Sequence, residues 1–547
     1  MKFSRLVPAA AAALLLASAM PAQTITVDLA DDQIDVDPET ATLADLPGPD
    51  GHISFSEAVI ASNHTPGRQT IGFAVPTSEW TYLNWYYPGR AVVHAAPAFY
   101  WGVYDEVTID GRTQTAFTGD TNPSGNEVVL LGGGPLYLAA DDCTVTGLDA
   151  SSIRVEGARA RVLDNSLLGL DLYGAGGTLV SGNTGGGYVQ IDQSDDNVVV
   201  GNTLSRVRVL GWIAGGRPAR NNRIGGPTLA ERNHILGQGY LDSHGQPNGF
   251  AVQLFESVGT VLENNWIGMT ADGLAQGAPD NPLGVYIDSE NHEVLLRDNR
   301  IAGIRALVRP PHSNSYWTGT AIQIGGMGSG FTLVGNKIGL DANDAPLLGA
   351  VSGIQLLDYV YGPLENVVIG GTGPGAGNEL AGHLGNAITV AHSLASVRIS
   401  GNSIHDNGGL GIDLVTDGFL QGVTPNDLLD LDSGGNGLQN FPSLRHALRV
   451  GRGVLVSGEL GSEPRRAYAL EFFASPTLDP SGFGEGARFL GRTTLVTDGQ
   501  GREGRAAQLA SAAPLGWFVT ATATDLARGA TSEFSAGKRL TQLFGVH

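Results

Sequence analysis

The chain has 547 residues, of which 42% are hydrophobic, and a formal charge of −22 that arises from 54 acidic and 32 basic side chains. It is too hydrophobic for a disordered protein, and its negative charge argues against binding to a nucleic-acid backbone. Neutral glycans, basic partners and divalent cations are compatible with this charge. The single cysteine, Cys143, excludes an intrachain disulfide, and its strand-like surroundings predict a buried side chain.

Residues 1–22 have the features of a signal peptide for export. Lys2 and Arg5 precede an apolar, alanine-rich run at residues 7–17, and an Ala-Ser-Ala cleavage site follows at residues 17–19. A membrane span needs roughly 20 apolar residues, and neither this run nor any later segment reaches that length. We therefore expect a protein that is secreted or held at the cell surface, without a membrane span.

Residues 23–95 are expected to form an N-terminal capping segment. Ser54 followed by Glu57 is a capping box, which predicts a short helix that presents Phe55 and Val59. A helix of this kind would cover the open end of a β solenoid, where backbone groups and apolar side chains are otherwise exposed.

An aromatic cluster follows this helix at Tyr82, Trp85, Tyr86 and Tyr87. If the rings are exposed, they form a platform on which sugars can stack. If the cluster is an insertion packed over the end of the solenoid, the rings are buried. The second alternative is favoured.

From about residue 96 to residue 440, a short pattern recurs, in which an apolar pair and a spacer precede Asn, any residue and another apolar residue. The asparagines are Asn165, Asn183, Asn202, Asn222, Asn265, Asn299, Asn336 and Asn402, and the first four stand 18, 19 and 20 residues apart. A period near 20 with short β-branched segments predicts a parallel β-helix. Each Asn is expected at a corner, where its amide can bond the coils above and below.

Residues 450–540 differ from the solenoid. Short strand-like runs, such as residues 468–473 and 518–525, are separated by turn residues. This pattern is typical of a small antiparallel, Ig-like β-sandwich. The predicted fold is therefore all-β, with an N-terminal cap, a parallel β-helix solenoid and a C-terminal sandwich.

Residues 50–59 resemble the CSLREA motif of secreted bacterial β-helix proteins. They read Asp-Gly-His-Ile-Ser-Phe-Ser-Glu-Ala-Val, where the family has Asp-Gly-x-Cys-Ser-Leu-Arg-Glu-Ala-Ile. Ile53 replaces the cysteine and Ser56 replaces the arginine. The solenoid repeats, the junction at residues 436–442 and the tail are also similar to this family. The resemblance implies a right-handed parallel β-helix of the pectin-lyase-like fold and no particular activity.

Two groups of residues carry chemistry that a polysaccharide lyase or glycoside hydrolase would need. Asp195 and Asp196 are adjacent carboxylates, and an inverting glycosidase uses two carboxylates roughly 6.5–9.5 Å apart. Arg206 and Arg208 can share one face of a strand and supply the base of a lyase. The Gly-His-Gly and Arg-x-Lys elements of pectin hydrolases are absent. Solvated corner aspartates and acid-pairing arginines are therefore the favoured alternatives.

Asp427, Asp430, Asp432 and Asn436 place oxygen ligands close together in a glycine-rich stretch. Such ligands suit calcium, although their spacing is not that of an EF-hand. The favoured alternative is a hydrogen-bonded linker loop. No cofactor is required, and calcium is the one candidate.

The expected function is adhesive, structural or glycan-binding, exerted through the long side of the solenoid. The expected partner is a polysaccharide or a cell-surface glycan, and not a nucleic acid. The alternative is a polysaccharide lyase or a glycoside hydrolase. A carboxylate pair beside an arginine in a groove would favour the enzyme, whereas a flat polar face would favour binding. The oligomeric state stays open.

Overall fold

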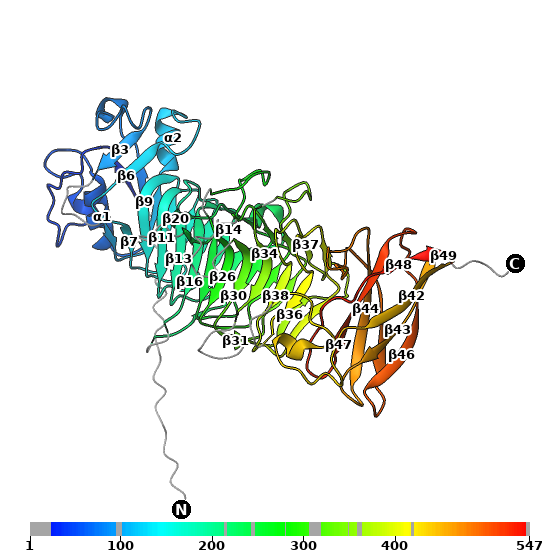
Figure 1. The fold of residues 1–547 in the computed structure, drawn as a ribbon. Helices are drawn as coiled ribbons and strands as arrows, with labels where there is room; N and C mark the ends of the chain where they lie inside the picture. The colour runs from blue at the N-terminus through cyan, green and yellow to red at the C-terminus, as the bar shows by residue number, and fades with distance from the viewer. Residues whose placement is uncertain are drawn as a thin grey trace, which may run out of the picture.

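The computed structural model describes residues 23–94, 101–212, 216–241, 247–278, 281–305, 319–347, 349–357, 364–416 and 421–542. The expected signal peptide at residues 1–22 lies outside them. Figure 1 shows an elongated body in which stacked parallel coils lead to a C-terminal unit of longer strands. Within the described ranges, no helix is both long and apolar enough to cross a membrane.

Two long parallel sheets run along the solenoid, and each of their strands pairs with the equivalent strand of the neighbouring coils. Sheet A comprises β1 (Gln23–Val27), β2 (Gln69–Phe73), β5 (Val107–Asp110), β8 (Thr144–Thr146), β10 (Arg161–Leu163), β12 (Leu179–Ser181), β14 (Val198–Val200), β18 (Arg223–Gly225), β24 (Val261–Glu263), β28 (Leu295–Arg297), β32 (Thr332–Val334), β36 (Val367–Gly370) and β39 (Val397–Ser400). Sheet B comprises β3 (Ala91–His94), β6 (Val128–Leu131), β9 (Leu148–Val155), β11 (Ser166–Tyr173), β13 (Tyr188–Asp192), β16 (Arg206–Leu210), β22 (Val252–Phe255), β26 (Leu283–Asp288), β30 (Thr320–Ile324), β34 (Ser352–Leu356), β38 (Ile388–Val390) and β41 (Ile412–Leu414), with β4 (Gly102–Val103) and β7 (Leu136–Leu138) at its side.

Two shorter parallel sheets complete the later coils. Sheet C comprises β15 (Thr203–Leu204), β19 (His234–Ile235), β25 (Trp266–Ile267), β29 (Arg300–Ile301), β33 (Lys337–Ile338), β37 (Glu379–Ala381) and β40 (Ser403–His405). Sheet D comprises β17 (Ala219–Arg220), β23 (Ser257–Val258), β27 (Glu290–His292), β31 (Met327–Ser329) and β35 (Leu364–Glu365). A small antiparallel hairpin, β20 (Gly239–Leu241) and β21 (Pro247–Gly249), lies between β19 and β22 in the chain.

Alternation of side chains explains why these short segments form a solenoid. The central residue of each sheet A strand points into the core, in register with its equivalents in neighbouring coils. The fully buried members of this stack are Ile71, Ile109, Val145, Val162, Val180, Val199, Ile224, Leu262, Leu296, Leu333 and Ile369. Burial of one such side chain contributes about 1.5–3 kcal/mol, so each coil is stabilised by contact with its neighbours.

Helix α1 (Phe55–Asn63) begins after the capping box of Ser54 and Glu57, as predicted. The Ser54 hydroxyl accepts the Glu57 N–H, and the Glu57 carboxylate accepts the Ser54 N–H. Phe55 is fully buried, with its ring centroid 5.7 Å from that of Phe73 and 4.9 Å from that of Trp101. The helix therefore packs onto the first coils through the predicted apolar side chains. A second helix, α2 (Arg112–Thr118), follows β5.

The solenoid begins before the expected boundary at residue 96. β1 pairs with β2, β2 with β5 and β3 with β6, all in parallel register. The segment at residues 23–95 therefore supplies coils as well as the capping helix, which is inserted between β1 and β2. Strand-like alternation at residues 24–29 and 70–73 indicates β1 and β2, but these first coils lack the asparagine that marks later ones, so they were not assigned to the solenoid.

The C-terminal unit consists of two sheets of four strands. They comprise β46 (Arg502–Leu509), β43 (Gly453–Gly461), β42 (Ser443–Val450) and β49 (Thr541–Gln542) in one, and β45 (Arg488–Val496), β44 (Ala467–Ser475), β47 (Phe518–Asp525) and β48 (Lys538–Arg539) in the other. All neighbouring strands are antiparallel except β42 and β49. This is the predicted sandwich, and it starts at Ser443, slightly before the expected boundary at residue 450.

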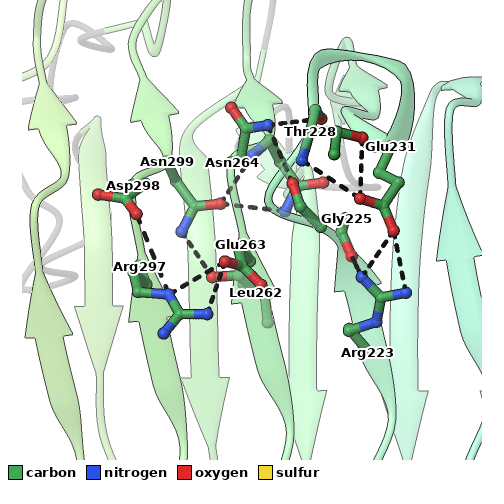
Figure 2. A network of polar contacts seen from close by, with 12 residues as sticks. Arg223, Gly225, Thr228, Glu231, Leu262, Glu263, Asn264, Arg297, Asp298 and Asn299 are labelled. Atoms are coloured by element: carbon green, nitrogen blue, oxygen red, sulfur yellow. Dashed lines mark hydrogen bonds and ion pairs between the residues drawn. The ribbon is translucent and has the colours of Figure 1, made fainter.

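The recurrent asparagines form a buried ladder. Its rungs are Asn165, Asn183, Asn202, Asn233, Asn265, Asn299, Asn336, Asn378 and Asn402, each at most 3% exposed. The Oδ1 of each later rung accepts hydrogen bonds from the rung before it, as Asn299 does from the backbone N–H and the Nδ2 of Asn265 at 3.0 Å. Each Nδ2 also donates to a sheet A carbonyl of the preceding coil, as that of Asn299 does to Leu262 (Figure 2). The predicted ladder is confirmed.

Asn222 is the one predicted rung that belongs elsewhere. Its Oδ1 accepts hydrogen bonds from the backbone N–H and the Nδ2 of Asn197, which makes a second, shorter ladder. The main ladder continues at Asn233 instead, because a turn closed by Thr228 and Glu231 is inserted before β19 (Figure 2). The 20-residue spacing from Asn202 to Asn222 is therefore a coincidence and not one coil.

The sandwich covers the C-terminal end of the solenoid. Three of its glutamates accept backbone N–H groups from the last coil, at 2.8–3.2 Å. The pairs are Glu471 with Gly401, Glu485 with Asn407, and Glu533 with both Leu414 and Thr424. Phe473 and Phe534 of the sandwich also belong to the same hydrophobic core as the coils. Donors that an open solenoid end would leave unpaired are thus satisfied.

Candidate functional site

Strand β16 reads Arg-Val-Arg-Val-Leu and alternates between the core and the outer face of sheet B. Val207 and Val209 are 0% exposed, whereas Arg206, Arg208 and Leu210 are half-buried on the outer face. Successive side chains of a strand point to opposite faces, so both arginines share one face, as predicted.

Arg208 belongs to a row of polar side chains that crosses sheet B from coil to coil. Gln190 on β13 and Gln253 on β22 are in register with it. Its Nη1 donates to the Oε1 of Gln190 at 3.1 Å, and its Nε donates to the Oε1 of Gln253 at 3.0 Å. The row continues to Asp171 in one direction and to Tyr286 in the other. The two glutamines therefore fix the orientation of the guanidinium across three coils.

A pocket of about 490 Å³ opens beside Arg208. Its lining residues are Asp192, Arg208, Leu210, Gly211, Trp212, Gln253, Phe255 and Glu256. Trp212 is 58% exposed, although large aromatic side chains are usually buried. The pocket combines an aromatic surface with guanidinium, amide and carboxyl groups, which is a composition suited to a ligand with both apolar faces and polar edges.

The arginines of this face lie over aromatic rings. The distances from Cζ to the ring centroid are 5.0 Å for Arg154 and Tyr173, 5.2 Å for Arg206 and Tyr188, and 5.8 Å for Arg208 and Phe250. Such cation–π contacts hold the guanidinium groups in place on the surface of the sheet. The outer face of sheet B therefore carries fixed planar charges next to rings.

Glu256 is the pocket residue whose protonation is most altered. Its side chain is buried, and its φ of 55° lies in the left-handed region, which is uncommon for residues other than glycine. Burial, and to a lesser extent the charge of Glu290, raises the pKa of Glu256 to about 7, against the opposing effect of a hydrogen bond with Ser289. In a large fraction of the molecules, the Glu256 carboxyl group is therefore protonated and neutral near pH 7.

The structure places Asp195 and Asp196 at the corner that follows β13. Asp195 accepts hydrogen bonds from the Nη1 of Arg217 at 2.5 Å and from the backbone N–H of Arg220. Asp196 accepts one from the Nδ2 of Asn221. Neither aspartate lines the pocket beside Arg208, so the carboxyl groups in that pocket are Asp192 and Glu256 instead.

The junction before the sandwich brings Asp427, Asp430 and Asp432 together, with one carboxylate oxygen of each within 4.8 Å of the others. Asp430 also accepts hydrogen bonds from the Asn440 N–H and the Ser462 hydroxyl. Burial, followed by the charges of neighbouring aspartates, raises the pKa of Asp430 and of Asp432 to about 6. Both a bound cation and a hydrogen-bonded linker are compatible with this geometry.

The side chain of Asn436 is engaged apart from these aspartates. Its Oδ1 accepts the Val397 N–H at 2.8 Å, and its Nδ2 donates to the carbonyl oxygens of Val397 and Thr531. Asn436 thus ties the last strand of sheet A to the sandwich, and both polar atoms of its amide are engaged there.

The aromatic cluster of the N-terminal region is exposed. Trp85 is 81% exposed, Tyr86 62% and Tyr82 45%, whereas Trp80 is buried at 9%. The favoured expectation of a packed insertion is therefore wrong for the tip of this loop. Trp80 anchors the loop through its Nε1, which donates to the carbonyl of Val75, and the ring centroid of Tyr82 lies 4.0 Å from that of His94.

Sequence reasoning missed Trp212, Gln253 and Glu256. Trp212 lies two residues after the end of the arginine-bearing strand β16, and this position was the only signal in the sequence. Gln253 lies 45 residues after Arg208 in the chain, yet one coil away in space. Because coil lengths vary so much, the partner of a given residue in the next coil cannot be counted from the sequence.

No family model and no curated protein matches the chain. Among solved structures, the chain is similar to the tailspike protein of E. coli bacteriophage HK620, solved in complex with a pentasaccharide. The identity is 9%, the alignment covers 86% of this chain and 92% of the tailspike, and the TM-score is 0.18. The assignment as a parallel β-helix rests on the sheets of this chain, and the resemblance to CSLREA-type proteins stays a prediction from residues 50–59.

Proposed function

We propose that this chain is an exported β-helix protein that binds glycans on the outer face of sheet B. The observation that carries the proposal is the pocket beside Arg208, where the exposed ring of Trp212 stands among guanidinium, amide and carboxyl groups. Sugars have apolar C–H faces that stack on aromatic rings, and hydroxyl groups that bond planar polar side chains. The polar row continues into neighbouring coils, so several linked sugars can contact the same face.

The test is binding of the purified protein to soluble polysaccharides, measured by isothermal titration calorimetry. Trp212→Ala should weaken binding of each ligand by roughly tenfold, because an aromatic contact of this kind is worth about 1.5 kcal/mol. Trp85→Ala is the matched control, since it removes an exposed indole from a different loop. Binding that survives Trp212→Ala but is lost in Trp85→Ala would contradict the proposal and move the function to the N-terminal loop.

Export is the second part of the proposal, and residues 1–22 support it. If the signal is cleaved near residue 19 or 22, the secreted protein should begin just before β1. Amino-terminal sequencing of protein recovered from the culture medium or the cell surface tests this. A chain that keeps Met1 and stays in the cytoplasm would contradict export.

Hydrolysis of the bound glycan is a second candidate function, because two carboxyl groups line the pocket. Asp192 ends β13, and Glu256 follows β22, with one strand between them. Two strand spacings give backbones about 10 Å apart, close to the separation that inverting glycosidases use. Partly protonated Glu256 would be the acid and Asp192 the base. Hydrolysis would be supported if the wild type releases reducing ends and Glu256→Gln loses this release while it still binds the glycan. If the wild type binds the glycan and releases no reducing ends, binding is the function of the pocket.

A further inference from the structure

We propose that the glycan bound on sheet B carries carboxylate groups, as a uronic-acid polymer does, and that the guanidinium of Arg206 binds them. This inference rests on the proposed function and names the chemical class of its ligand. It assigns to Arg206 a role in ligand binding that differs from that of a lyase base.

The first observation is the incomplete bonding of Arg206. Its Nε is buried and has no hydrogen-bond partner within the described part of the chain. The contact that holds the side chain is with the ring of Tyr188, on the neighbouring strand β13. A buried donor without an acceptor destabilises a protein, and a charged donor does so more strongly than a neutral one. A carboxylate in the plane of the guanidinium would supply the acceptor.

The second observation is the contrast with other arginines of these coils. Arg154 pairs with Glu156 at 2.6 Å, Arg217 with Asp195 at 2.5 Å, and Arg223 with Glu231 at 3.2 Å. These three ion pairs use carboxylates of the protein itself. Arg206 has no carboxylate within 4.0 Å among the described residues, although the chain has 54 acidic side chains. Arg161, Arg220 and Arg232 likewise form no ion pair among the described residues, but Arg206 is the described arginine that also has a buried donor without an acceptor, which points to an anion from outside.

The third observation is that a second guanidinium lies on the same face. Arg208 follows two residues later, so the backbones of the two arginines are roughly 7 Å apart along the strand. Its Nε and Nη1 are held by the neutral amides of Gln253 and Gln190. Together the two arginines offer a positive site beside the pocket, wide enough to contact one acidic sugar or two adjacent ones.

Acidic groups also lie near this positive site, namely Asp192 and Glu256 in the pocket and Asp171 beside Tyr188. Asp171 accepts a hydrogen bond from the Tyr188 hydroxyl at 3.2 Å, and it thereby orients the ring under Arg206. Burial raises the pKa of Asp171, while the charges of Arg154 and then Arg206 act against that rise. The rest of the negative charge is spread over an elongated molecule, and salt screens it beyond about 8 Å at physiological ionic strength.

The test compares three uronic-acid polymers, namely alginate, hyaluronan and polygalacturonate, with the same polymers after reduction of their carboxylates to alcohols. Each is titrated into the full-length protein by calorimetry. The wild type should bind at least one native polymer roughly tenfold or more tightly than its reduced form, as expected for hydrogen bonds to a charged group. Arg206→Gln should abolish that preference. Arg217→Gln is the matched control, because it removes an arginine already paired with Asp195.

Equal affinity for native and reduced polymers would overturn this inference while leaving glycan binding in place. Native affinity that is unchanged in Arg206→Gln would also overturn it. Binding of dextran sulfate without binding of any uronate would replace the carboxylate assignment with a sulfate. Absence of binding to every polymer, including neutral dextran and xylan, would refute the proposed function as well.

Discussion

Replacement of Asn336 by alanine should destabilise the solenoid more than most single substitutions. Asn336 is 0% exposed and lies near the middle of the ladder. Its Oδ1 accepts the backbone N–H and the Nδ2 of Asn299, both at 3.0 Å. Its Nδ2 donates to the carbonyl of Leu296 and to the Oδ1 of Asn378, both at 2.9 Å. The substitution removes these four hydrogen bonds and leaves their partners buried.

The expected loss follows from this geometry. A hydrogen bond within a protein contributes about 1 kcal/mol net, so the four bonds together contribute about 4 kcal/mol. Typical single substitutions cost about 0.5–3 kcal/mol. The predicted loss of free energy of unfolding therefore exceeds that of a typical single substitution.

Urea unfolding followed by circular dichroism measures this loss by linear extrapolation. Asn343→Ala is the matched control, because Asn343 is exposed in a turn of the same coil. Its stability should stay within about 0.5 kcal/mol of the wild type. A loss below about 1 kcal/mol in Asn336→Ala would refute the view that the amide ladder stabilises the coils.

Three further predictions concern acidic side chains and the thiol of Cys143. If Asp430 and Asp432 hold calcium, a chelator should lower the melting temperature of the wild type but not of the Asp430→Asn, Asp432→Asn double variant; identical curves with and without chelator would leave the hydrogen-bonded linker. Burial raises the pKa of Glu533 from 4.5 to about 8, so its stabilising effect is full below pH 4.5 and is lost as the pH rises through 8. Urea titrations should therefore show a steeper loss of stability over this range in the wild type than in Glu533→Gln, and parallel profiles would contradict the assignment. Cys143 is fully buried with a pKa raised to about 11, so a maleimide should label it only after unfolding, and rapid labelling of the native protein would show that the core is open there.

The sequence was sufficient to predict the solenoid because its signal is local and repeated. Each Asn follows a short apolar strand, and the same arrangement recurs from Asn165 to Asn402. The assignment failed at Asn222, where an inserted turn moved the true rung to Asn233. The sequence shows a regular period where the coils have equal length. An insertion changes the number of residues between two rungs, although the strands of neighbouring coils keep their register in three dimensions.

The candidate site was only partly predictable for the same reason. Alternation along one strand is a local rule, and it placed Arg206 and Arg208 on one face. The pocket, however, needs residues from three coils, and Asp192 and Gln253 are separated by a segment of variable length. The capping glutamates of the sandwich were equally hidden, since Glu533 meets Leu414 across 119 residues.

Hydroxyl-radical footprinting with a bound glycan tests the location of the binding face most directly. The exposed rings of Trp212 and Trp85 provide two reporters in one molecule, since both react readily when they are uncovered. Saturation with a polysaccharide that binds should protect Trp212 and Tyr188 from oxidation and leave Trp85 as reactive as in the free protein. Protection of Trp85 with unchanged reactivity at Trp212 and Tyr188 would contradict the assignment of glycan binding to sheet B.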